Sequence, residues 1–235
     1  MASLVGEKGV MASLVIDTPP VSLLRAYAVA EHAEALLRGG GLRLRRIEYY
    51  RTIEDLKRQD SAEGEAHLRV PRDVTTVRID RTSGAVVGQS NAPGHLNWQM
   101  SFQNPTYALC LSHPGVNISE LTARFGTHVI EVVQPVQFLG RLHLRAQALR
   151  LPNRAVDFVD CFPVRYDKGL VGAAPDDPSE IMRLSYGQKT PGFAVEREYR
   201  CVVVLSGPSA GAPDYLDLEL GDVRELARSY PSVGA

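Results

Sequence analysis

Residues 201–204 form an unbroken apolar run, CVVV, which directly follows the charged segment EREYR at residues 196–200. β-Branched residues favour strands, and a short apolar run without polar interruption is typical of a buried strand. The Pro-Gly pair at residues 191–192 predicts a turn just before this strand. The chain must therefore fold so that a buried strand begins within a cluster of carboxylates and guanidinium groups.

Within a strand, residues two apart face the same side, so the pattern predicts that Glu196, Glu198 and Arg200 share one face. Two carboxylates about 7 Å apart repel each other unless a cation, a ligand or hydrogen bonds hold them. One interpretation is a salt-bridge cluster at the strand end, in which Glu198 pairs with Arg200 and a neighbour. The other makes Glu198 a catalytic or substrate-binding carboxylate at the edge of a cleft, with Glu196 supporting it. The sequence leaves both open.

The rest of the chain predicts an α+β fold, with a mixed, mainly antiparallel sheet and flanking short helices. We expect a loose tail at residues 1–20, followed by one domain over residues 21–235. Apolar patterns predict strands at 21–29, 42–50, 61–70, 75–80, 84–90, 107–112, 127–133, 136–144, 156–166, 199–207 and 214–220. Helices are expected at 30–40, 51–60, 178–189 and 221–230. Residues 71–106 are poorly defined by these patterns.

Composition narrows the function classes. A chain of 235 residues can bury a single sizeable core, and its formal net charge of −1 argues against a nonspecific nucleic-acid coat or a polybasic membrane anchor. No run approaches the about 18 apolar residues that a membrane span needs, so we expect a soluble protein without a membrane partner. The segment MASLV occurs at residues 1 and 11, so we expect either that Met11 is the natural start or that residues 1–10 are an addition.

The three cysteines, Cys110, Cys161 and Cys201, are odd in number, lie in apolar segments and form no CxxC pair. This usage is typical of reduced core residues in a cytoplasmic protein, and it predicts no zinc site. A second charged stretch, residues 49–65, includes Asp60 and Glu63. It indicates a solvated helix and an acidic turn, with a carboxylate site for a hard cation as the alternative.

Several common catalytic motifs are missing from the sequence. It contains no G-x-S-x-G elbow, no P-loop and no G-x-G-x-x-G, and the glycines at 39–41 end a helix where a phosphate site needs them to begin one. Ser112 and His113 are neighbours on a predicted strand, so they face opposite sides and do not form a nucleophile–base pair. The aromatic pair beside Arg51 offers a surface on which a base or nicotinamide ring could stack.

The order LLRAYAV, LLRGGGLRL, YALCLS, ARFGTHVIEV, FPVRYDKG and GQKTPGFAVEREYR resembles a bacterial family known only as a domain of unknown function. Its marks are an L-C-x-S strand and a closing K…E-x-E-[WY]-R. More distantly, the chain resembles ADP-ribosyltransferases. That resemblance implies NAD as the substrate, with Arg25 contacting its phosphates or ribose, Ser112 holding the nicotinamide side, Glu198 as the catalytic glutamate and Glu196 completing E-x-E. The strand residue Tyr27 and Arg51 complete the expected NAD-binding set.

Three functional hypotheses follow. The first is an NAD-consuming ADP-ribosyltransferase or NAD glycohydrolase, with a protein, nucleic-acid or small-molecule acceptor and a role in toxicity or phage defence. The second is a non-catalytic sensor or binding module whose charged surface is formed by residues 51–60 and 196–200. The third is a metal-dependent nuclease or hydrolase that uses Asp60, Glu63, Glu196 and Glu198. Whether the protein is an enzyme is left open at this stage.

Overall fold

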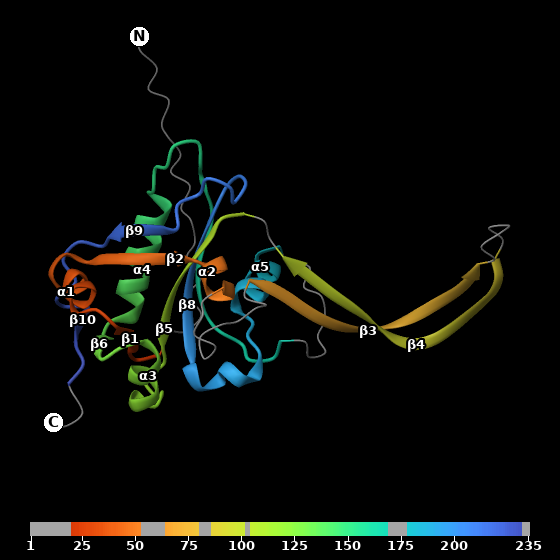
Figure 1. The fold of residues 1–235 in the computed structure, drawn as a ribbon, viewed down its shortest axis with the longest axis horizontal. Coiled ribbons are helices and arrows are strands. Elements are labelled where there is room, and N and C mark those ends of the chain that lie inside the picture. Colours follow the sequence, from red (N-terminus) through yellow and green to blue (C-terminus); the bar gives the residue numbers. More distant parts are fainter. Residues whose placement is uncertain (1–19, 53–63, 80–85, 102–103, 169–177, 232–235) are drawn as a thin grey trace, which may run out of the picture.

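The computed structural model describes residues 20–52, 64–79, 86–101, 104–168 and 178–231 (Figure 1). The strands are β1 (Leu23–Tyr27), β2 (Gly41–Arg46), β3 (Glu65–Ile79), β4 (Val86–Ser101), β5 (Thr106–Ser112), β6 (His128–Val132), β7 (Val156–Pro163), β8 (Glu198–Leu205), β9 (Tyr215–Glu219) and β10 (Ala227–Ser229). The helices are α1 (Ala30–Gly39), α2 (Ile47–Thr52), α3 (Ile118–Phe125), α4 (Pro135–Gln147), α5 (Pro178–Gly187) and the 3₁₀ helix η1 (Pro191–Glu196). The predicted α+β class, with a mainly antiparallel sheet, is confirmed.

The main sheet has eight strands and divides at β5. One edge of β5 pairs with β8 over its whole length, from Thr106 to Ser112. On the other edge, β2 pairs with Tyr107 and Ala108, whereas β1 pairs at Ser112. Residues 109–111 therefore have no strand partner on that edge within the described chain. The sheet forks there into one branch of β1, β6 and β10 and another of β2 and β9.

The apolar runs of β5 and β8 are explained by burial on both faces of the sheet. Cys201, Val203 and Leu205 belong to the larger core cluster, which also contains apolar residues of α1 and α4. The alternate residues Val202 and Val204 pack in a second cluster with residues of α2 and α5. Because both faces are covered, neither strand needs the polar alternation of a half-exposed strand.

Two predicted elements are wrong throughout, and the strand expected at 42–50 is wrong over residues 47–50, which lie in α2. Residues 136–144, expected as a strand, lie in α4, whose buried positions Phe138, Leu139, Leu142 and Ala146 follow a helical spacing behind a proline at the first turn. Residues 221–230, expected as a helix, contain only turns and the short strand β10, which pairs with the edge of β6. Tertiary pairing outweighs local helix propensity there. Within the described residues, none of the helices has the length and apolar character needed to cross a bilayer.

Strands β3 and β4 form a separate two-stranded sheet that extends away from the rest of the molecule (Figure 1). They replace the three short strands expected between residues 61 and 90. The base of this hairpin lies next to α5. Proline occurs once in each strand, at Pro71 and Pro93, and proline, which has no backbone N–H, is typical of strands at the edge of a sheet.

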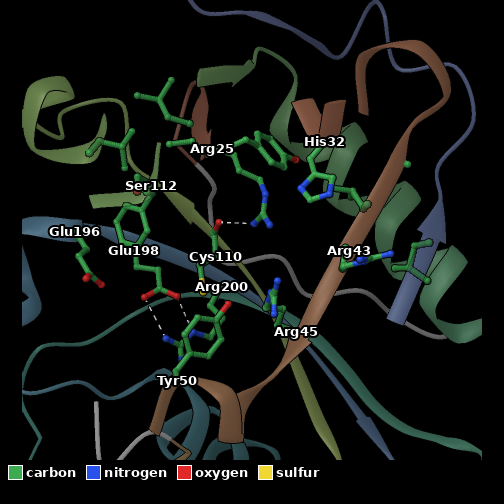
Figure 2. Close-up of a pocket in the computed structure, with 18 of the residues that line it drawn as sticks. Arg25, His32, Arg43, Arg45, Tyr50, Cys110, Ser112, Glu196, Glu198 and Arg200 are labelled. Atoms are coloured by element: carbon green, nitrogen blue, oxygen red, sulfur yellow. Dashed lines mark hydrogen bonds and ion pairs between the residues drawn. The ribbon is translucent and has the colours of Figure 1, made fainter. Parts of the chain in front are cut away.

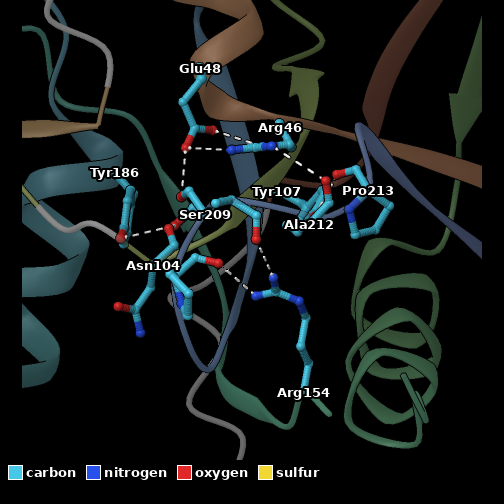
Figure 3. Close-up of polar contacts among 12 residues, drawn as sticks. Arg46, Glu48, Asn104, Tyr107, Arg154, Tyr186, Ser209, Ala212 and Pro213 are labelled. Carbon is cyan, nitrogen blue, oxygen red and sulfur yellow. Dashed lines mark hydrogen bonds and ion pairs between the residues drawn. The ribbon is translucent and has the colours of Figure 1, made fainter. Parts of the chain in front are cut away.

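The loop between β8 and β9 is held by side chains that donate to its backbone carbonyl groups (Figure 3). Arg154 Nη1 donates to the carbonyl oxygens of Ser206 and Pro208, and its Nη2 donates to that of Ala210, at 2.9–3.1 Å. Tyr107 Oη donates to the carbonyl oxygen of Pro213 at 2.7 Å. This loop delivers β9 to the edge of β2, and so it fixes one branch of the fork.

We predict that Arg154→Met lowers the free energy of unfolding by about 1–3 kcal/mol, because three carbonyl groups lose a charged donor together. Arg150→Met is the matched control, since Arg150 donates only to carbonyl groups one and three residues before it and is exposed. Urea denaturation of both variants measures the difference. Equal destabilisation by the two substitutions would contradict a specific role for Arg154 in the loop.

Candidate functional site

A cavity of about 420 Å³ opens at the fork of the sheet, a size that suits a small-molecule ligand (Figure 2). Its walls come from α1, α3, β1, β2, β5, β8 and β9, together with Tyr50 from α2 and with residues that precede β8. Charged and polar residues that line it are Arg25, Tyr27, His32, Arg43, Arg45, Tyr50, Cys110, Ser112, Lys189, Glu196, Glu198, Arg200, Asp217 and Glu219.

Glu198 begins β8 and is buried between two cations. Arg200 donates to both carboxylate oxygens, with Nε–Oε1 at 2.7 Å and Nη2–Oε2 at 3.1 Å, and Lys189 Nζ lies 2.8 Å from Oε2. Arg200 is itself anchored by donating from Nη1 to the carbonyl oxygen of Tyr186 at 2.6 Å. The salt-bridge interpretation of the EREYR segment is thus confirmed for Glu198 and Arg200, and the same carboxylate also lines the cavity.

Glu196 lines the cavity although its position does not follow from the alternation of side chains along a strand. It ends η1, and Arg197 then adopts a left-handed conformation with φ 42°, so Glu196 and Glu198 are not two positions of one strand. The predicted shared face is wrong for Glu196 because this left-handed residue breaks the alternation. The two carboxylates meet instead at Lys189, whose Nζ lies 2.8 Å from Glu196 Oε2 and 2.8 Å from Glu198 Oε2.

The two carboxylates differ in acidity. Burial raises the pKa of Glu198, but the adjacent Arg200 and Lys189 outweigh it and hold that pKa well below the usual range. Burial raises the pKa of Glu196, and its interaction with Lys189 offsets this only in part. Glu198 is therefore the ionised member of the pair, and Glu196 is the member that accepts a proton more readily. The neighbouring Cys110 thiol has its pKa raised to about 12 by burial and by Glu198, so it remains protonated.

The other predicted site residues mostly converge on the same cavity. Arg25 lies on β1 and donates from Nη1 to the carbonyl oxygen of Cys110 at 2.9 Å, on the edge of β5 that the fork leaves without a strand partner. Its guanidinium carbon lies 4.9 Å from the centre of the Tyr27 ring. Ser112 is paired opposite Glu198 across β5 and β8. Three segments far apart in the sequence, namely β1, β5 and the residues around the start of β8, are thus brought to one cavity.

The side chain of Arg51 lies outside the residues whose side chains the structure describes, as do Asp60 and Glu63. The structure therefore leaves the predicted role of Arg51 and half of the metal-site hypothesis untested. Among the described residues, no group of three or more His, Cys, Asp or Glu side chains is arranged to hold a metal ion.

Sequence reasoning missed Lys189 and Arg45 as cavity residues. Lys189 stands seven residues before Glu196, and only the fold of η1 brings its amine back to both carboxylates. Arg45 did carry a signal, because the alternation in LRLRR places Arg43 and Arg45 on one face of β2 and the buried Leu42 and Leu44 on the other. That pattern identifies an exposed basic face, which here borders the cavity.

No protein-family model matches the chain, and no curated protein or solved structure matches it either. The resemblances noted from the motifs therefore remain predictions, and the residues of the cavity are what a function can be inferred from.

The opposite pKa directions predict opposite pH effects on stability. For Glu198, whose folded-state pKa is lowered, the stabilisation is present above the unfolded value of about 4.3 and is lost as the pH falls through the folded value. For Glu196, whose folded-state pKa is raised, stability is greatest below about pH 4.3 and declines as the pH rises through the folded value.

We therefore expect Glu198→Gln to flatten the loss of stability on acidification, and Glu196→Gln to flatten the loss on raising the pH. Glu198→Gln should also cost about 3–5 kcal/mol at pH 7, because Arg200 and Lys189 lose a buried partner. Denaturant unfolding of the wild type and both variants between pH 3 and 8 measures these slopes. A change of the same sign in both variants would show that the acidity of the pair is wrongly assigned.

Proposed function

We propose that this protein cleaves the N-glycosidic bond between nicotinamide and ribose in NAD, as an ADP-ribosyltransferase or an NAD glycohydrolase. The observation that carries the proposal is the convergence of Arg25, Ser112, Glu196 and Glu198 on one cavity at the fork of the sheet. This chemistry uses an ionised carboxylate, a second carboxyl group that binds protons more tightly, a hydroxyl and a guanidinium.

In the proposed reaction, the bond between C1′ of the ribose and the nicotinamide nitrogen breaks, and nicotinamide leaves with the bonding electron pair. Positive charge develops on the ribose ring, and the ionised Glu198 stabilises it electrostatically. Water or an acceptor then bonds to C1′ and gives up a proton. Glu196 is suited to accept that proton, because burial raises its pKa.

The neighbouring groups fit the binding of the rest of NAD. Ser112 is buried on the strand next to Glu198, and its hydroxyl supplies a hydrogen-bonding group for the nicotinamide side of the proposed ligand. Arg25 supplies a guanidinium that suits phosphate oxygens, and Tyr27 and Tyr50 supply ring surfaces in the same cavity. A role in toxicity or phage defence rests on the resemblance alone.

One observation favours a second candidate, a module that binds NAD or a related nucleotide without turnover. Arg200 and Lys189 contact both oxygens of Glu198, so its negative charge is already partly compensated. A compensated carboxylate stabilises a developing positive charge less than an isolated one does. Binding and turnover therefore have to be measured separately.

We predict that the purified protein releases nicotinamide from NAD, and that Glu198→Gln reduces the rate by about 100-fold or more through lost electrostatic stabilisation. Chromatographic detection of nicotinamide measures the rate, with circular dichroism as a check that the variant is folded. Ser112→Ala, which removes no buried charge, should raise the KM for NAD and tests the same cavity if Glu198→Gln does not fold.

Glu34→Gln is the control, because Glu34 forms an exposed ion pair with Arg38 on α1 and does not line the cavity. It should leave the rate unchanged. Calorimetric NAD binding without nicotinamide release would select the binding module. Full activity in a folded Glu198→Gln variant, or neither binding nor release by the wild type, would overturn the proposal.

A further inference from the structure

Two guanidinium groups in the cavity, those of Arg25 and Arg45, have no carboxylate partner among the residues that the structure describes. Arg25 uses Nη1 for the carbonyl oxygen of Cys110, and its Nε is buried without a hydrogen-bond partner. Arg45 lies over the Tyr49 ring, with its guanidinium carbon 4.5 Å from the ring centre. Figure 2 shows the two side chains pointing toward each other from β1 and β2.

Other cations that line the cavity differ in this respect. Arg200 and Lys189 contact Glu198, and Arg43 forms a bidentate pair with Asp217, at 2.8 and 3.0 Å. The contrast between Arg43 and Arg45 is direct, because they stand two residues apart on the same face of β2. One of the two positive charges is neutralised by the neighbouring strand β9, and the other is left facing the cavity.

The carboxylates of the cavity do not neutralise this pair. Glu196 and Glu198 are held by Lys189 and Arg200. Glu219 is paired opposite Gly41, at the far end of β2 from Arg45. Four residues along a strand correspond to about 13 Å, which is beyond direct ion pairing. Among the described residues, Arg25 and Arg45 thus give the cavity positive charge that no carboxylate pairs with.

We propose that Arg25 and Arg45 together form an anion subsite that binds the pyrophosphate group of the ligand. Two like charges that face one cavity repel each other, and a bound anion with several oxygens removes the repulsion and satisfies the free N–H groups. A planar guanidinium binds two phosphate oxygens at once, so two of them from different strands match a group with two phosphates. Naming this ligand as NAD rests on the proposed function, whereas the subsite itself is testable alone.

The test is calorimetric titration of sodium pyrophosphate into the wild type, Arg45→Gln and Arg38→Gln at constant ionic strength. We expect Arg45→Gln to weaken binding at least about tenfold, because a charged bidentate contact is lost. Arg38→Gln is the control, and its effect should stay within about twofold because Arg38 forms an exposed ion pair with Glu34 on α1 and does not line the cavity. Arg45 is exposed, so its substitution should leave the fold intact.

Absence of pyrophosphate binding to the wild type, or equal weakening in both variants, would overturn the subsite. Titration with ADP-ribose identifies the source of the anion. Tighter binding of ADP-ribose than of pyrophosphate, with the same Arg45→Gln penalty, supports a dinucleotide, whereas equal affinities support free pyrophosphate at the same subsite.

The nicotinamide-release assay separates this inference from the proposed function. If pyrophosphate binding depends on Arg45 but the wild type does not cleave NAD, the proposed subsite is supported and the proposed reaction is contradicted. NAD cleavage with an unchanged KM in Arg45→Gln would support the proposed reaction and contradict the proposed subsite.

Discussion

The pairing of β5 with β8 is the constraint on which the rest of the structure depends. Seven consecutive residue pairs join the two strands, and both strands are covered on both faces. A register shift of one residue would move every side chain to the opposite face, so burial fixes the register firmly. The same register places Ser112 opposite Glu198 and Cys110 opposite Arg200. The register of the β5–β8 pair therefore determines both the packing of the core and the positions of these cavity residues.

The fork of the sheet follows from the other edge of β5. Because β2 pairs at one end of that edge and β1 at the other, the middle residues keep backbone groups free for other partners. The carbonyl oxygen of Cys110 takes Arg25 as its donor. The gap between the two branches is thus lined by polar and charged side chains. A cavity at such a divergence can collect side chains from strands that never pair with one another.

Local sequence patterns predicted the elements of the fold that are determined by the spacing of neighbouring apolar residues. The buried strands at β5 and β8, helix α1 with its glycine end and the antiparallel α+β class all follow from periodicity and from the burial it implies. The cavity residues Arg25, Ser112, Glu196 and Glu198 were named from motif order, and all four line one cavity. Strand alternation failed where a single left-handed residue, Arg197, separates the two glutamates. The bridge at Lys189 was also missed, because it depends on how η1 folds back rather than on spacing.

The charges of the cavity are distributed in a way that bears on what it can bind. Removing Glu198 from water is costly, and the contacts with Arg200 and Lys189 offset that cost. This carboxylate is therefore fixed in place and ionised before any ligand arrives. Arg25 and Arg45 have no carboxylate partner among the described residues, so an anionic ligand would supply the negative charge that they lack.

A dinucleotide with a central pyrophosphate and a cationic nicotinamide end would place each charge against its opposite. In NAD cleavage, positive charge moves from the nicotinamide ring onto the ribose as the bond breaks. A rigid carboxylate beside the ribose would then interact more strongly with the transition state than with the bound substrate, which is the condition for catalysis.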